Sequence, residues 1–177
     1  MGKFCQRFDG PCHHRVKVNK NKCFIVMSYS QKHSKVIEKM LKTALKKSGM
    51  IPILAKDIKH ATGDMFCSTV CRPLMGSIIC IIDMTYNNTS VGFEHGVAEH
   101  GLEKPCIITR YKLPRTGNLS QKEGKILEKL KNEGKIQFSV VPFSPPADFA
   151  GVHRIDYSSQ KELDDAIKAF FKIRKIT

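Results

Sequence analysis

The amino-acid sequence predicts an α/β fold: a three-layer α/β/α domain of flavodoxin-like type, built on a five-stranded, mostly parallel sheet. Two observations predict it. Short apolar runs alternate with helical patterns along the chain, and such alternation requires crossover connections, which produce parallel strands. The length of 177 residues suits a single domain with one buried core.

Five segments carry the pattern of buried strands, in which most residues are apolar and many are β-branched. They are residues 23–28 (CFIVMS), 50–54 (MIPIL), 77–83 (SIICIID), 105–109 (PCIIT) and 152–157 (VHRIDY). The segment 77–83 is the most apolar, so we expect it in the centre of the sheet. Pro52 cannot donate a backbone hydrogen bond, and it therefore favours an edge position for the second strand.

Helical patterns fall between these strands. The first begins near Ser34, a suitable N-cap, presents Val36 and Ile37 on its apolar face, and ends before Gly49. Further helices are expected at about 64–75, 91–103 and 122–134. The last helix starts with a capping box formed by Ser159 and Glu162.

Charge is distributed unevenly along the chain. The net charge is +14, and each of the segments 1–22, 32–48 and 110–135 carries +5. Residues 73–103 contain four acidic residues and no Lys or Arg. This contrast predicts an acidic site within a positive field, which would attract an anionic nucleotide or a nucleic acid. The lysines of 32–48 alternate with an apolar face, so we interpret them as a solvated helix surface.

No apolar run reaches the roughly 20 residues needed to cross a bilayer. The first residues, MGKFCQRFDG, lack the apolar stretch of a secretory signal. We therefore expect a cytoplasmic protein with no membrane partner. The chain has seven cysteines, and this odd count, with Cys80 and Cys106 inside apolar runs, predicts reduced thiols.

The expected domain organisation is a basic N-terminal extension, residues 1–22, followed by a single domain, residues 23–177. The extension holds a cluster of candidate zinc ligands: Cys5, Cys12, His13 and His14. A structural zinc ion is one interpretation of this cluster, but its spacing lacks the CxxC pair of common zinc sites. We expect that the protein requires no cofactor.

In open α/β sheets, ligands bind beyond the carboxyl ends of the strands, where the strand order reverses. Here that point lies between the first and third strands. The polar residues delivered to it are Ser28, Tyr29, Ser30, Asp83, Thr85 and Asn88, followed by Gly92 and Glu94 in the next helix. This dense polar set, after strands that are almost wholly apolar, predicts a binding site.

Glu94 is the sharpest candidate. In the first turn of a helix beginning at Val91 it would interact favourably with the helix dipole, so a stabilising role and a chemical role both remain open. Asp83 ends an apolar strand and must be hydrogen-bonded, either at a turn or to a ligand. His95 and His100 lack the i, i+4 spacing of helical metal ligands, and we predict that both lie on the surface.

Several common active-site motifs are missing. The sequence contains no GxxxxGK[ST] loop, no GxGxxG after the first strand and no GxSxG. P-loop nucleotidases, standard dinucleotide dehydrogenases and α/β-hydrolases are therefore unsupported.

A longer pattern is more informative. It consists of a strand ending in Asp-x-Thr, an Asn-containing turn, an aromatic residue before Glu, then Gly-x-Ala and Lys-Pro before a strand. Its residues are Asp83, Thr85, Asn88, Phe93, Glu94, Gly96, Ala98, Lys104 and Pro105. With this pattern, residues 23–109 resemble the nucleoside 2-deoxyribosyltransferase-like proteins and the related Toll/interleukin receptor (TIR)-like domains of prokaryotes.

The resemblance implies chemistry at an N-glycosidic bond. In the transferases the Glu matching Glu94 attacks the anomeric carbon, and in the NAD-cleaving TIR enzymes a corresponding Glu supports the sugar as nicotinamide leaves. Nicotinamide is already a cationic leaving group, whereas a neutral purine needs a proton, which Asp83 or Asp64 would supply. The transferases commonly carry Asp six positions before the Glu, where this chain has Asn88.

We therefore expect an enzyme that hydrolyses or transfers at the N-glycosidic bond of NAD or a nucleotide, with NAD as a candidate substrate. Glu94 and Asp83 are the expected catalytic residues. The expected substrate-binding residues are Ser28, Tyr29, Ser30, Asp64, Thr85, Asn88 and Gly92. The alternative is a non-catalytic TIR-like signalling module that binds a nucleotide or a protein partner. A homo-oligomer is expected, and non-specific nucleic-acid binding through the basic segments is a third hypothesis.

Overall fold

The computed structural model describes residues 4–5, 10–11, 14–58, 66–86, 89–113 and 154–176. The chain divides into two compact units, Met1–Lys112 with His153–Thr177, and Leu113–Val152. The second unit lies outside the described residues except for Leu113, and the helix predicted at 122–134 falls within it.

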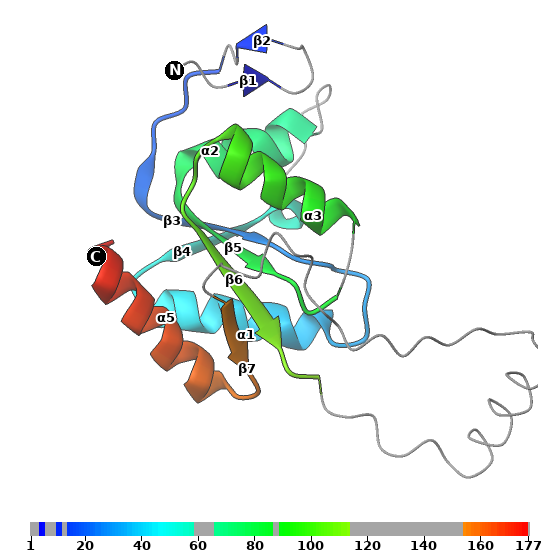
Figure 1. Cartoon of the computed structure of the whole chain (residues 1–177), viewed down its shortest axis with the longest axis vertical. Helices are drawn as coiled ribbons and strands as arrows, with labels where there is room; N and C mark the ends of the chain where they lie inside the picture. Colours follow the sequence, from blue (N-terminus) through cyan, green and yellow to red (C-terminus); the bar gives the residue numbers. More distant parts are fainter. Residues whose placement is uncertain are drawn as a thin grey trace, which may run out of the picture. The chain divides into compact units, whose positions relative to one another are not determined.

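The first unit contains a five-stranded sheet in which every pairing is parallel (Figure 1). The strand order is β4-β3-β5-β6-β7. The strands are β3 (Asn19–Val26), β4 (Ile51–Leu54), β5 (Ser77–Asp83), β6 (Cys106–Tyr111) and β7 (Arg154–Tyr157). This order confirms the predicted fold class, with the most apolar strand in the centre and the Pro52 strand at an edge.

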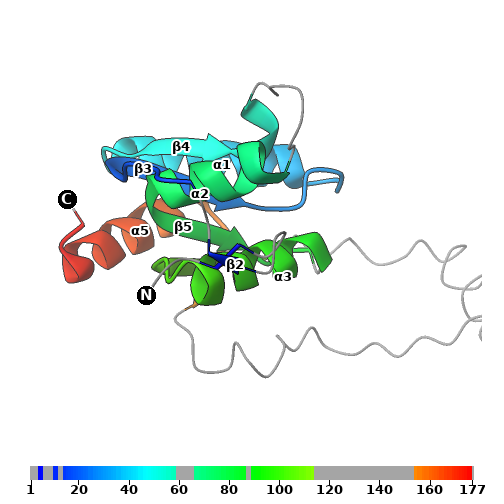
Figure 2. The same cartoon turned by 90° about the horizontal axis from the view of Figure 1, so that it is seen from above.

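Helices cover both faces of the sheet, as Figure 1 shows. One face carries α1 (Ser34–Lys47) and α5 (Gln160–Arg174). The other carries α2 (Arg72–Gly76) and α3 (Thr89–Gly96), and Figure 2 looks onto this second layer. The π-helical turn η2 (Cys67–Cys71) precedes α2, and the π-helical turn η3 (Val97–Gly101) follows α3.

The core between the sheet and α1 and α5 explains why α1 forms where it does. Ile37, Leu41, Ala44 and Leu45 are fully buried, and their spacing places them on one helix face. Burying each of the larger aliphatic side chains contributes roughly 1.5–3 kcal/mol. Val36 lies outside this stripe at 48% exposure, so the prediction that it shares the apolar face is wrong.

The helix ends agree with the sequence in one case and differ in another. The Ser159 hydroxyl accepts a hydrogen bond from the backbone N–H of Glu162 at 3.3 Å, which confirms Ser159 as the N-cap. The Glu162 carboxylate of the predicted box accepts from the backbone N–H of Ser158 at 2.7 Å. Ser34 is the first residue of α1 rather than its N-cap, and its hydroxyl accepts from the backbone N–H of Gln31 at 3.1 Å. The predicted N-cap of α1 is therefore wrong, because Ser34 closes the preceding turn.

The sheet also starts earlier than the apolar pattern indicated. β3 begins at Asn19, so the last residues of the predicted extension belong to the sheet, and its first three residues are exposed. A two-residue antiparallel pair, β1 (Phe4–Cys5) and β2 (Gly10–Pro11), precedes it. Among the described helices, none is both long and apolar enough to cross a bilayer.

Lys104, just before β6, holds the start of that strand to the start of β5. Its ammonium group donates to the carbonyl of Met75 at 2.9 Å and to that of Ser77 at 2.6 Å, and hydrogen bonds from charged donors are the stronger ones. We expect Lys104→Met to lower the free energy of unfolding by about 1–3 kcal/mol, measured by urea denaturation. Lys168→Met, at an exposed position of α5, is the control. An equal effect in both variants would contradict this role for Lys104.

Candidate functional site

The strand order reverses between β3 and β5. After β3 the chain adds β4 on one side of it, and the later strands β5, β6 and β7 are added on the other side. The carboxyl ends of both strands lie at the same edge of the sheet because the strands are parallel. Ser28 and Tyr29 follow β3, and Thr85 follows β5. The edge predicted from the sequence to bind a ligand is therefore formed.

Glu94 lies on the side of α3 that meets the sheet. Val91, His95 and Ala98 are buried and mark the sheet-facing stripe of this helix, and Glu94 lies half-buried beside them. Helical side chains lean toward the N-terminus of their helix, and the N-terminus of α3 follows the carboxyl end of β5. A Glu94 side chain with this lean points toward the predicted edge.

The helix around Glu94 begins earlier than expected. α3 starts at Thr89, and its first turn contains no acidic residue, so the prediction that Glu94 lies in the first turn is wrong. Dipole stabilisation is confined to the first and last turns of a helix. Interaction with the helix dipole therefore does not explain a carboxylate at this position.

Burial raises the pKa of the Glu94 carboxyl group to about 7. No other cause contributes to this shift, and no described residue forms a hydrogen bond or ion pair with Glu94 in the structure. The ordinary pKa of Glu is 4.5. At neutral pH this group is therefore divided between its acidic and basic forms, a condition suited to proton transfer or nucleophilic attack.

Tyr29 is one of two described residues, with Cys80, whose pKa is raised by burial and further by the negative charge of Glu94. Its side chain is 40% exposed, and its pKa is raised mainly by burial and next by the negative charge of Glu94. The charges of Glu38 and Asp57 raise it further. The ammonium group of Lys56 lies 5.4 Å from the centre of the Tyr29 ring, so cationic and anionic groups meet around this phenol.

Ser28 adds a buried hydroxyl group to the same edge. Its side chain is 5% exposed, and its oxygen has no hydrogen-bond partner among the described residues. Such a group carries a cost of roughly 1–3 kcal/mol, which a bound ligand would offset. Ser30, two residues later, is exposed.

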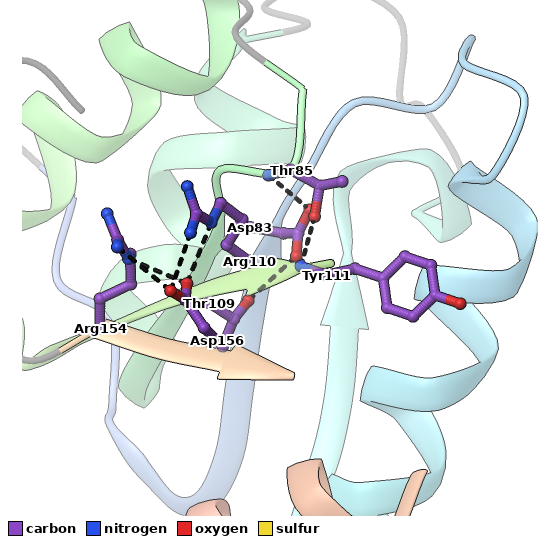
Figure 3. A network of polar contacts seen from close by, with 7 residues as sticks. All are labelled: Asp83, Thr85, Thr109, Arg110, Tyr111, Arg154 and Asp156. Carbon is purple, nitrogen blue, oxygen red and sulfur yellow. Dashed lines mark hydrogen bonds and ion pairs between the residues drawn. The ribbon is translucent and has the colours of Figure 1, made fainter. Parts of the chain in front are cut away.

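Asp83 has a different environment, drawn in Figure 3. Its carboxylate accepts from the backbone N–H of Thr85 at 3.2 Å and from the Thr109 hydroxyl at 3.1 Å. The hydroxyl of Thr85 in turn accepts from the backbone N–H of Tyr111 at 2.8 Å. These contacts hold the end of β5 to β6.

Burial raises the pKa of Asp83 to about 6, although the hydrogen bonds from Thr85 and Thr109 act in the opposite direction. Asp83 alternates with Ile79 and Ile81 along β5, and both of these belong to the core against α1 and α5, so Asp83 faces the side of the sheet opposite α3. None of its described contacts is to Glu94. The geometry separates the two expected catalytic carboxylates, and the catalytic role of Asp83 stays a prediction.

Figure 3 also shows an ion-pair cluster that the sequence analysis missed. Asp156 contacts Arg110 at 2.8 Å and Arg154 at 2.9 Å, and Arg110 lies directly opposite Asp156 in the pairing of β6 and β7. The alternation of VHRIDY would have placed Arg154 and Asp156 on one face. This cluster joins the last two strands of the sheet.

His95 corrects another prediction. It was expected on the surface, yet it is 6% exposed, and its Nε2 lies 2.9 Å from a carboxylate oxygen of Glu99. Burial lowers the pKa of His95 despite the nearby Glu99 charge. His95 lies four residues after Val91 and three residues before Ala98, and this helical spacing is the sequence pattern that indicates its burial.

The remaining predicted site residues are distributed as follows. Gly92 is exposed, and a Cβ atom there would meet nothing within 4 Å, so no contact within the described protein requires glycine. Asp64 and Asn88 lie outside the described residues, as do the side chains of Cys5, Cys12 and His13. His14 is exposed. No metal-binding group of His, Cys, Asp and Glu occurs in the part of the chain that the structure describes.

An exposed aromatic side chain lies next to Glu94 in the sequence. Phe93 is 52% exposed and packs on Phe66 with ring centres 5.6 Å apart. α3 therefore presents an exposed aromatic ring one residue before Glu94. No protein-family model matches the chain, and a comparison with curated proteins found no match.

Proposed function

We propose that the protein cleaves or transfers at the N-glycosidic bond of NAD or a nucleotide, with Glu94 acting on the anomeric carbon. The observation that carries the proposal is the half-buried Glu94 carboxyl group, whose pKa is raised to about 7 and whose charge adds to the effect of burial in raising the pKa of Tyr29. Departure of a base leaves positive charge on the sugar, and a desolvated carboxylate can stabilise that charge or trap the sugar covalently.

NAD is the substrate that this environment favours. No second carboxyl group among the described residues contacts Glu94, and Asp83 is hydrogen-bonded to Thr85 and Thr109. A neutral purine needs a proton donor as it leaves, whereas nicotinamide leaves NAD without one. The Ser28 hydroxyl, which has no hydrogen-bond partner among the described residues, and the phenol of Tyr29 are suited to bind ribose hydroxyl groups.

The decisive experiment is base release from NAD, NADP and a panel of nucleoside 5′-monophosphates, followed by chromatography. We expect nicotinamide release by the wild-type protein and by Glu103→Gln, which changes an exposed carboxylate near the same helix. Glu94→Gln is expected to release base at least about 10³-fold more slowly. Nucleotides that raise the melting temperature without any release of base would instead support the non-catalytic TIR-like module. If neither turnover nor stabilisation occurs, both interpretations fail.

The pH dependence identifies the form of Glu94 that acts. A nucleophilic or charge-stabilising role requires the carboxylate, so kcat/KM for NAD is expected to rise with pH through about 7 and to level off above it. Rates measured between about pH 5 and pH 9 cover both limits. A rate that falls through the same range would assign Glu94 the role of proton donor.

A further inference from the structure

A basic hollow lies beside the candidate site, along the outer face of α1 and the short 3₁₀ helix η1 (Ala55–Asp57). Its volume is about 470 Å³. Five lysines, one carboxylate and one hydroxyl line it: Lys35, Lys39, Lys42, Lys46, Lys56, Glu38 and Thr43. We call this the α1 hollow.

The positive charge of the α1 hollow is only partly neutralised. Lys42 contacts Glu38 at 2.8 Å and Asp57 at 2.7 Å, and Lys56 also pairs with Glu38. These contacts fix two of the lysines and use both carboxylates. The other lysines, Lys35, Lys39 and Lys46, are exposed, and no described carboxylate lies within ion-pair distance of them.

Lys56 connects the α1 hollow with the candidate site. It lines the hollow, and its ammonium group lies over the ring of Tyr29. The negative charge of Glu94 in turn adds to the effect of burial in raising the pKa of Tyr29. The N-terminal end of α1, where Lys35 lies, follows β3 at the same sheet edge. One end of the hollow is therefore next to the residues expected to hold the sugar.

That end of α1 has further positive potential. Its first turn contains no acidic residue, and its N-cap, His33, makes no side-chain hydrogen bond to the helix. Free N–H groups at a helix N-terminus favour anions. They add to the field of the lysines rather than forming a site alone.

We propose that Lys35 and Lys39 bind the 5′-phosphate groups of the substrate, so that the site accepts nucleotides and dinucleotides and rejects bare nucleosides. The inference rests on the proposed function, because it places the sugar at Glu94. A 5′-phosphate is attached to the same sugar whose anomeric carbon reacts. A sugar held at Glu94 and Tyr29 therefore carries its phosphate only a few bonds away from its own anomeric carbon. Ammonium groups bind phosphate through charge-assisted hydrogen bonds.

A second basic hollow provides the control. Ser48, Lys168, Phe171, Lys172 and Lys175 line a space of about 310 Å³. It lies at the C-terminal ends of α1 and α5, which reach the amino edge of the sheet. Removing two lysines here changes the net charge equally but leaves the candidate site untouched.

The test measures binding in the Glu94→Gln protein, so that turnover does not interfere. Isothermal titration with ADP and with adenosine compares Lys35→Gln/Lys39→Gln against Lys168→Gln/Lys172→Gln. We expect the first pair to raise the Kd for ADP by about tenfold or more and to leave adenosine binding unchanged. The second pair is expected to alter neither Kd by more than about twofold.

Three results would overturn the inference: no binding of ADP, equal binding of ADP and adenosine, or an equal loss of ADP affinity in both lysine pairs. The last would show an effect of net charge alone. Base release by the protein with an intact Glu94 is a separate measurement. Lysine-dependent ADP binding without base release from any substrate would retain the phosphate site and reject the proposed chemistry.

Discussion

Replacing Glu94 with glutamine is expected to lower kcat/KM for base release by about 10³-fold or more, a loss typical of removing a group that acts only in the transition state. Glutamine keeps the size of the side chain but carries no negative charge, so it can neither trap the sugar nor stabilise its positive charge. Initial rates with NAD measure the effect, and Glu103→Gln is the matched control. A variant that retains most of its activity would remove Glu94 from the mechanism.

The same substitution is expected to make the protein more stable above pH 7. Burial raises the pKa of Glu94 from 4.5 to about 7, so the folded state binds this proton more tightly than the unfolded state. The associated stability is present below the unfolded pKa and is lost as pH rises through the folded value. Glutamine avoids this loss, and we expect a gain of about 1–2 kcal/mol, allowing for partial solvent screening.

Urea denaturation at two pH values checks this expectation. Near pH 8 Glu94→Gln is expected to have the higher free energy of unfolding, and near pH 4 the wild-type protein and the variant are expected to be equal, because the carboxyl group is then protonated in both states. Glu103→Gln is expected to show no such pH dependence. A destabilised Glu94→Gln protein at pH 8 would mean that the carboxylate has a stabilising partner.

Asp83 is expected to give the second largest effect. Asp83→Ala removes the acceptor for Thr85 and Thr109, and we expect it to lower the free energy of unfolding by about 2–4 kcal/mol. Asp83→Asn is expected to stay within about 1 kcal/mol of the wild type, since the amide oxygen accepts from Thr85 and the Thr109 hydroxyl can rotate to accept from the amide nitrogen.

Base release by Asp83→Asn separates the two roles considered for this residue. Retained turnover in a stable Asn variant would show that Asp83 positions the end of β5 and donates no proton. Turnover lost at unchanged stability would support the acid role that the sequence analysis predicted. Denaturation and rate measurements on the same preparation decide between them.

The places of two strands in the sheet were predictable from their composition. β5 is almost entirely buried, and its apolar sequence is that of a central strand, whereas Pro52 belongs at an edge. Because β5 is apolar throughout, its composition does not show on which face of the sheet the Asp83 side chain lies. A strand buried on both faces shows no alternation of polar and apolar residues, so the sequence does not tell on which face its last side chain lies.

The surroundings of Glu94 were predictable only in part. The reversal of strand order indicated that Tyr29 and Glu94 share an edge, and in the structure the charge of Glu94 adds to the effect of burial in raising the pKa of Tyr29. The depth of Glu94 depends on where α3 begins and on how it packs against the sheet, and an early start at Thr89 placed Glu94 beyond the first turn. The raised pKa follows from tertiary burial, which no local pattern reports.

The short strand β4 bears on how copies of this protein would associate. In a strand at the margin of a sheet, every second N–H points outward and is available for edge-to-edge pairing with another chain. At Pro52 no such donor exists, and β4 offers only the four residues Ile51–Leu54. A strand from a second copy that paired with β4 would lack a backbone hydrogen bond at Pro52. Copies that associate on this side would therefore have to do so through packed helices rather than through a shared sheet.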